Sequence, residues 1–182
     1  MPGRLSVALN AVSFQTAWVA CVVGAAWGHP WVGPAVVLGA LALHACLVHD
    51  PGRALGAALL IGLAGFLVDS VLGMLGILQF VDGMDSDWLC PPWLVALWMV
   101  FATTPEFSLQ WLCGRPRLAA AFGAVAGPAS YHVGASLGAL RIGEPAVISL
   151  MTLACVWALV LPLMMEGVGT SMRAMAWRGG PG

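Results

Sequence analysis

Six long runs of mostly apolar residues fill nearly the whole chain, and short polar connections separate them. A helix needs roughly 17–25 such residues to cross a bilayer, and inside a bilayer only helices and closed barrels satisfy their backbone groups. The runs lie approximately at Leu5–Trp27, Trp31–Val48, Ala54–Leu78, Pro92–Leu112, Leu118–Leu140 and Pro145–Met165. We therefore expect an all-α, multi-pass membrane protein, with one six-span bundle over residues 1–166 and a short tail over residues 167–182.

The composition supports this class. Hydrophobic residues make up 60% of the chain, charged residues make up 8%, and lysine is absent. Soluble domains are typically about 25% charged. No basic patch is present to neutralise phosphates, so we expect no nucleic-acid partner.

The arginines predict the orientation, because cytoplasmic loops of membrane proteins carry an excess of basic residues. If both termini and the tail are cytoplasmic, only Arg141 lies outside, and six arginines lie inside: Arg4, Arg53, Arg115, Arg117, Arg173 and Arg178. The outer side then holds an acidic loop and an aromatic belt: Asp82, Asp85, Asp87, Trp27, Trp31, Trp88 and Trp93. The all-arginine basic set and the many alanines and glycines favour a bacterial inner membrane.

One carboxylate interrupts the third apolar run. Asp69 lies near its middle, where a charged side chain costs roughly 2.5–3.5 kcal/mol on insertion scales. An ionisable group at such a depth usually faces the inside of a bundle and has a function. Asp69 is therefore the first candidate for a buried polar site.

Small residues form stripes on three of the predicted helices. At about 100° per residue, three sets each share one face: Gly62, Gly65, Asp69, Gly73 and Gly76; Ala119, Gly123, Gly127, Ser130, Gly134 and Gly138; and Asn10, Ser13, Ala17, Cys21, Gly24 and Gly28. Small residues let helices approach closely in lipid. We expect the first, third and fifth helices to form the closely packed centre, with Asp69 on a packed face.

The buried ionisable groups fall at two depths. At about 1.5 Å rise per residue, Asp69 and His132 share a level toward the outside, and Glu106 and His44 share a level toward the inside. One acid and one histidine at each level predict two pairs, or a relay across the membrane. The alternative for each residue is a structural hydrogen bond between helices, worth about 0.6 kcal/mol.

The five cysteines favour neither a disulfide framework nor a zinc site. Their number is odd and no CxxC spacing occurs. We interpret them as small apolar packing residues. No metal and no cofactor are expected.

Several polar and aromatic motifs follow one another in a characteristic order along the spans. They are Asn10, Phe14–Gln15 and Trp18 in the first, Val68–Asp69–Ser70 in the third, Phe101–Ala102–Thr103–Thr104 in the fourth, and Gly127–Pro128, Ser130–Tyr131, Gly134 and Gly138 in the fifth. In this order the chain resembles a family of small bacterial inner-membrane proteins catalogued as a domain of unknown function, DUF2878. The resemblance implies a polar signature at Asn10, Gln15, Asp69, Ser130 and Tyr131. The family has no established activity, but some members carry a permease label, and members often neighbour genes for fatty-acid or phospholipid modification.

The chain departs from the family pattern at two places. Relatives often carry Asn-His-Ser where this chain has Glu106–Phe107–Ser108, and a basic residue where it has Ser136. His132 falls at a position that varies in the family. These departures weaken a family-wide role for Glu106 and His132.

Three functions remain open. The first is binding or moving a small amphipathic or lipid molecule at Asp69. The second is an intramembrane lipid-modifying enzyme, with Asp69 or Glu106 as acid or base. We rank it lower, because its groups lie at two levels and no HxxxH or HxxE ligand spacing occurs. The third is a non-catalytic subunit or assembly factor. The partners expected are membrane lipids, an amphipathic ligand, and another membrane protein or a second copy.

Overall fold

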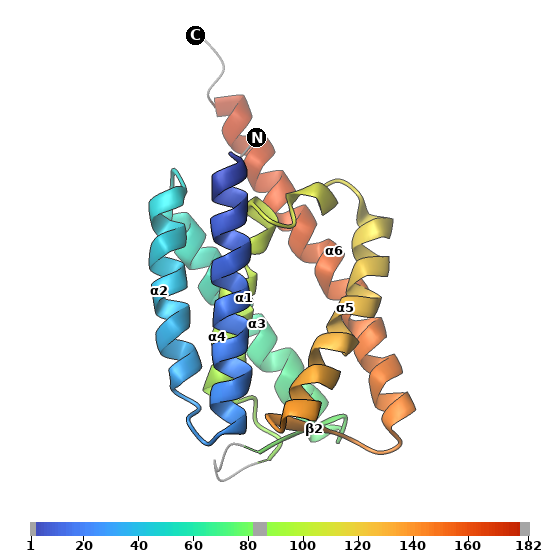
Figure 1. Ribbon diagram of the computed structural model, residues 1–182. Coiled ribbons are helices and arrows are strands. Elements are labelled where there is room, and N and C mark those ends of the chain that lie inside the picture. The colour runs from blue at the N-terminus through green and yellow to red at the C-terminus, as the bar shows by residue number, and fades with distance from the viewer. Residues whose placement is uncertain (1–2, 82–86, 179–182) are drawn as a thin grey trace.

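Long helices that alternate in direction build the protein (Figure 1). The structure is a computed structural model that describes residues 3–81 and 87–178, with side chains described as far as Gly167. Within these residues the helices are α1 (Arg4–Ala26), α2 (Val32–Leu47), α3 (Pro51–Met74), α4 (Pro92–Phe101), α5 (Pro116–Leu137) and α6 (Ala146–Arg178). The prediction of an all-α protein is confirmed.

Local sequence signals set the helix limits. Proline opens α3, α4 and α5, where its missing N–H would have no helical acceptor. The Asp50 carboxylate accepts a hydrogen bond from the Arg53 backbone N–H at 3.0 Å and so caps α3. Gly138 ends α5 in the left-handed conformation, with φ 93°.

The fourth helix is shorter than predicted. The fourth run was expected to be one helix as far as Leu112, but α4 ends at Phe101, and two 3₁₀ turns follow at Thr104–Glu106 and Gln110–Leu112. The reason is Pro105, which has no N–H and whose ring clashes with the carbonyl four residues earlier, on Phe101. That carbonyl instead accepts a hydrogen bond from the Thr104 hydroxyl at 2.8 Å.

Two short strands replace the predicted ends of the third and fifth spans. The strands β1 (Leu78–Phe80) and β2 (Leu140–Ile142) pair antiparallel, with Gln79 opposite Arg141. They join the chain after α3 to the chain after α5. We call this the ribbon end of the bundle, and the end where α1 begins is the terminal end (Figure 1).

The helices form two groups. In the first, α1 packs on α2, α3 packs on α4, and α4 also contacts α1 and α2; in the second, α5 packs on α6. The two groups meet along a seam, which the ribbon closes at one end. Figure 1 shows α5 diverging from α1 toward the terminal end, whereas α6 runs obliquely toward the start of α1.

The glycine stripes pack against helices other than those predicted. Gly65 on α3 lies against the Trp98 ring of α4, and Gly127 on α5 lies against the Trp157 ring of α6. The expectation that α1, α3 and α5 form the packed centre is therefore wrong. Helical periodicity identified the packed faces, but it does not identify the neighbour that each face receives.

The surface of the bundle is compatible with a membrane protein. Among the described residues, three helices are long and apolar enough to cross a bilayer, at Arg4–Ala26, Pro51–Met74 and Ala146–Gly167, and α2 is a shorter apolar helix. Large apolar side chains such as Leu38, Leu60 and Val125 are exposed on the outside.

At the ends of the bundle the structure differs from several sequence-based expectations. Of the predicted aromatic belt, Trp27, Trp31 and Trp88 are exposed, whereas Trp93 is buried in the core. Helix α6 continues beyond the predicted end of the sixth span and into the predicted tail, as far as Arg178. Asp82 and Asp85 of the predicted acidic loop lie outside the described residues, and Asp87 is exposed.

The packing at Gly65 predicts a sharp contrast between two alanine variants of α3. A Cβ at Gly65 would overlap the Trp98 ring, whereas a Cβ at Gly56 meets no atom within 4 Å. We expect Gly65→Ala to lose about 1–3 kcal/mol of unfolding free energy through overpacking. Gly56→Ala should be neutral or stabilising, because alanine favours helices. Thermal unfolding in detergent measures both, and equal midpoints for the two variants would contradict this packing.

Candidate functional site

A buried carboxylate connects the two helix groups. Asp69 of α3 is completely inaccessible, and both of its oxygens accept hydrogen bonds. Trp98 Nε1 of α4 donates to Oδ2 at 2.7 Å, and the Tyr131 hydroxyl of α5 donates to Oδ1 at 2.7 Å. Since Tyr131 belongs to the second group, the hydrogen bond from it crosses the seam.

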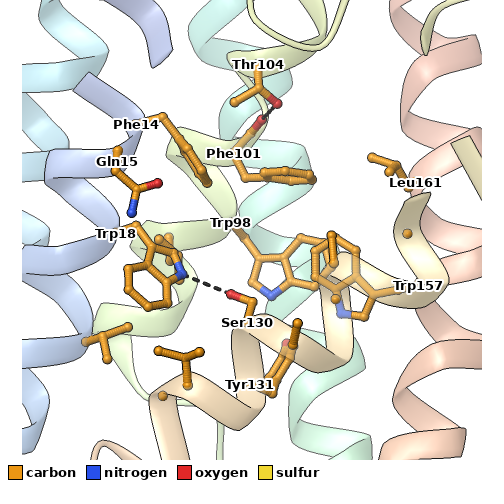
Figure 2. Close-up of a pocket in the computed structure, with 18 of the residues that line it drawn as sticks. Phe14, Gln15, Trp18, Trp98, Phe101, Thr104, Ser130, Tyr131, Trp157 and Leu161 are labelled. Atoms are coloured by element: carbon orange, nitrogen blue, oxygen red, sulfur yellow. Dashed lines mark hydrogen bonds between the residues drawn. The ribbon is translucent and has the colours of Figure 1, made fainter. Parts of the chain in front are cut away.

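An aromatic stack continues this connection. The rings of Trp98 and Trp157 lie 4.9 Å apart and nearly parallel, at 10°. Phe101 packs edge-on against Trp157, with ring centroids 5.5 Å apart (Figure 2). Gly65 and Gly127 leave the space in which these indoles fit. We call Asp69, Trp98, Tyr131 and Trp157 the central bridge.

On one side of the bridge lies the α1–α5 cavity, with a volume of about 570 Å³. It lies between α1 and α4 of the first group and α5 and α6 of the second (Figure 2). Its walls are mostly apolar, and they include Phe14, Leu97 and Phe122.

A few polar groups stand in these apolar walls. Trp18 Nε1 donates to the Ser130 hydroxyl oxygen at 2.9 Å, which joins α1 to α5 (Figure 2). Gln15 lies one turn from Trp18, lines the cavity and is exposed. Tyr131 and Ser130 also line the cavity, whereas Asp69 does not.

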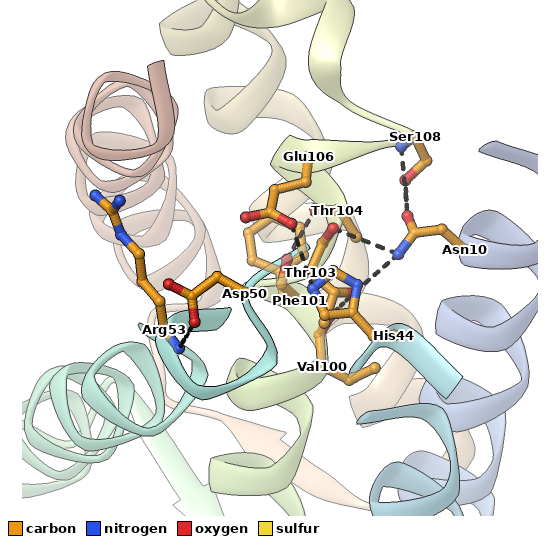
Figure 3. Close-up of polar contacts among 10 residues, drawn as sticks. All are labelled: Asn10, His44, Asp50, Arg53, Val100, Phe101, Thr103, Thr104, Glu106 and Ser108. Carbon is orange, nitrogen blue, oxygen red and sulfur yellow. Dashed lines mark hydrogen bonds and ion pairs between the residues drawn. The ribbon is translucent and has the colours of Figure 1, made fainter. Parts of the chain in front are cut away.

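Asn10 holds the irregular chain after α4 against α1. Its Nδ2 donates to the Thr103 hydroxyl at 2.9 Å, and its Oδ1 accepts from the Ser108 hydroxyl at 2.7 Å (Figure 3). Asn10 is 2% exposed. Backbone that leaves the helical pattern at membrane depth needs such substitutes for its lost hydrogen bonds.

A separate polar pair, His44 and Glu106, lies nearer the terminal end of the bundle. His44 Nε2 lies 3.5 Å from Glu106 Oε2 (Figure 3). The His44 ring is buried edge-on against Phe107, with ring centroids 5.5 Å apart. His44 Nδ1 has no hydrogen-bond partner among the described residues.

The predicted site residues therefore separate into distinct arrangements. His44 and Glu106 meet, as the depth argument predicted. The pairing of Asp69 with His132 is wrong, because His132 is exposed on the opposite side of α5 and Tyr131 is the residue that reaches Asp69. Within the described part of the chain, no hydrogen bond or ion pair links Asp69 to Glu106, so the predicted relay has no direct link there.

Sequence reasoning missed the aromatic half of the bridge. Trp98 and Trp157 each lie beside a glycine of a predicted stripe, and large rings are the natural partners of such gaps. The spacing of the small residues indicated gaps on these helix faces, but it did not indicate which tryptophans would fill those gaps. Thr103 and Ser108 were missed as partners of Asn10, because the fourth run was expected to be a regular helix.

Comparison with known proteins decides the family. The model of the family "Protein of unknown function (DUF2878)" matches residues 7–163, from α1 into α6. The chain belongs to this family. The resemblance inferred from the motifs is thereby confirmed. Neither the curated proteins nor the solved structures contain a match to the chain.

The central bridge predicts energetic coupling between Asp69 and Tyr131. In a double-mutant cycle with Asp69→Ala and Tyr131→Phe, we expect a coupling energy of about 1 kcal/mol, within the range of interhelical hydrogen bonds in membranes. Unfolding in detergent measures it. The control cycle pairs Asp69→Ala with His132→Asn and should give no coupling. Coupling to His132 but not to Tyr131 would contradict the bridge.

The contacts of Asn10 predict a local effect. Asn10→Leu removes the hydrogen bonds to Thr103 and Ser108, so amide hydrogen exchange in residues 102–113 should accelerate. Mass spectrometry of peptides from that segment measures the rate. The control is Ser13→Ala, since the Ser13 hydroxyl donates to the Asn10 backbone carbonyl of its own helix. Unchanged exchange in Asn10→Leu would show that Asn10 does not hold this segment.

Proposed function

We propose that this protein is an integral membrane protein that binds or moves a small amphipathic or lipid molecule in the α1–α5 cavity. The observation that carries the proposal is the cavity itself. It offers about 570 Å³ between apolar walls, and Gln15, Ser130 and Tyr131 supply polar groups within them. Ligand sites commonly combine such walls with a few polar groups that fix orientation.

The dimensions suit a molecule with an apolar chain. Along α4 the cavity wall extends from Trp93 to Phe101, which corresponds to about 12 Å of helix. Gln15 and Ala129 are exposed at its edge, on α1 and α5. A hydrophobic ligand in a bilayer would therefore enter sideways, between these two helices.

In this account Asp69 acts through its neighbours. Both carboxylate oxygens are already occupied, and the side chain does not line the cavity. Asp69 is thus a positioning residue that orients Trp98 and Tyr131 in the cavity wall. This revises the expectation that Asp69 itself orients a polar headgroup.

We further propose six membrane crossings, with both termini in the cytoplasm of a bacterial cell. The arginines support this orientation, because Arg4, Arg53, Arg115 and Arg117 lie at helix starts of the terminal end, and Arg141 lies in the ribbon. The short α4 is compatible with a crossing. Its irregular continuation is packed against α1 by Asn10, and non-helical backbone is tolerated in a membrane when protein surrounds it.

The proposal predicts that filling the cavity displaces the ligand. Ala126 lines the cavity, whereas the adjacent Val125 does not line it and is 72% exposed. Native mass spectrometry of protein extracted in mild detergent should show a discrete lipid-sized adduct on the wild type. The adduct should be lost in Ala126→Trp and kept in Val125→Trp.

A variant of Gln15 tests how much the polar wall contributes to ligand binding. Gln15→Leu preserves the size of the side chain and removes its amide, so the adduct should weaken without disappearing. If the wild type carries no adduct, or if both tryptophan variants keep it, the α1–α5 cavity is not the binding site. A second polypeptide retained by every variant would instead favour a subunit of a larger complex.

A further inference from the structure

A second cavity lies across Trp98 from the first. This α3–α6 cavity has a volume of about 630 Å³, and Trp98 lines both cavities. Its apolar walls come from α3 and α6, for example from Leu60, Ala64 and Leu163. The proposed function above does not use this cavity.

Charged groups of both signs gather at one end of the α3–α6 cavity. Arg53 and Asp50 belong to the turn that starts α3, and Glu106 follows α4 (Figure 3). All three side chains line this end of the cavity. This end therefore offers a cation beside carboxylates, and apolar walls begin directly behind it.

The cavity has the length of an acyl chain. Its wall on α3 extends from Arg53 to Val68, which corresponds to about 22 Å of helix. Half of a hydrocarbon core measures about 15 Å, so one leaflet's chain fits beside α3. The charged end lies where α2 gives way to α3, at the terminal end, which is where a headgroup would lie.

We propose that the α3–α6 cavity binds a phospholipid whose headgroup carries both a phosphate and a primary ammonium. The Arg53 guanidinium pairs with the phosphate, in the forked geometry that suits its oxygens. The Glu106 carboxylate accepts hydrogen bonds from the ammonium, which has three N–H donors. The acyl chain lies along α3 toward Trp98.

Charge explains this choice among headgroups. A purely anionic headgroup could pair with Arg53 but would meet the carboxylates of Asp50 and Glu106. A quaternary ammonium has no N–H to donate to Glu106. A headgroup with a primary ammonium avoids both penalties, so phosphatidylethanolamine should bind better than phosphatidylglycerol or phosphatidylcholine.

Lipid competition tests the proposal. The full-length protein is exposed to an equimolar mixture of phosphatidylethanolamine, phosphatidylglycerol and phosphatidylcholine with identical chains, and retained lipids are counted by native mass spectrometry. The wild type should retain phosphatidylethanolamine preferentially. Arg53→Gln and Glu106→Gln should each lower that retention about tenfold, as expected for one charge-assisted contact.

Two controls match these variants in chemistry. Arg141→Gln and Glu144→Gln make the same changes at exposed positions near the ribbon end, and they should retain the lipid as the wild type does. Arg53 is itself exposed, so its variant should fold even if Glu106→Gln disturbs the contact with His44. Ala64→Trp fills the cavity without changing a charge, and it should also lower retention.

The outcomes separate this site from the α1–α5 cavity. Ala126→Trp should lose the adduct that belongs to the α1–α5 cavity and keep phosphatidylethanolamine in the α3–α6 cavity, because the new side chain fills only the first cavity. A wild type without preference, or one that prefers phosphatidylglycerol, would overturn the assignment. So would unchanged retention in Arg53→Gln and Ala64→Trp, since the bound lipid would then be ordinary boundary lipid.

Discussion

Two hydrogen bonds to one buried carboxylate determine how the halves of this protein meet. Burying a carboxylate without partners is costly, and Asp69 avoids that cost because it accepts from Trp98 on its own side of the seam and from Tyr131 on the other. The stack of Trp98 on Trp157 adds an apolar contact at the same place. The central bridge thus fixes the middle of the seam between the two helix groups.

The two cavities follow from this arrangement. The α5–α6 pair contacts the rest of the protein at the ribbon, at the bridge, through the hydrogen bond from Trp18 to Ser130, and through a buried cluster near the terminal end that contains Leu112 and Leu161. Space therefore remains on both sides of Trp98, toward α1 in one direction and toward α3 in the other. We propose an amphipathic ligand for each space, and Trp98 of the central bridge lies between them.

The sequence predicted the helices, the family and the packed faces, because apolar length and the spacing of small residues are local properties. It predicted the meeting of His44 with Glu106 from depth alone. Depth in the membrane did not predict the partner of Asp69. Tyr131 and His132 lie at nearly the same depth, and only the direction of each side chain decides which of them reaches Asp69. The end of α4 was missed because the run remains apolar beyond Phe101, although Pro105 marks the break.

Photochemical cross-linking would show whether a lipid chain occupies the seam beside the central bridge. The protein would be reconstituted with a phospholipid that carries a diazirine on its acyl chain, irradiated and mapped by peptide mass spectrometry. We expect adducts on residues that line the two cavities, such as Ala11 and Ala126 in the α1–α5 cavity and Ala64 in the α3–α6 cavity. Adducts spread evenly over outward-facing residues such as Leu38 and Leu59, with none in either cavity, would overturn the assignment of a ligand to the seam.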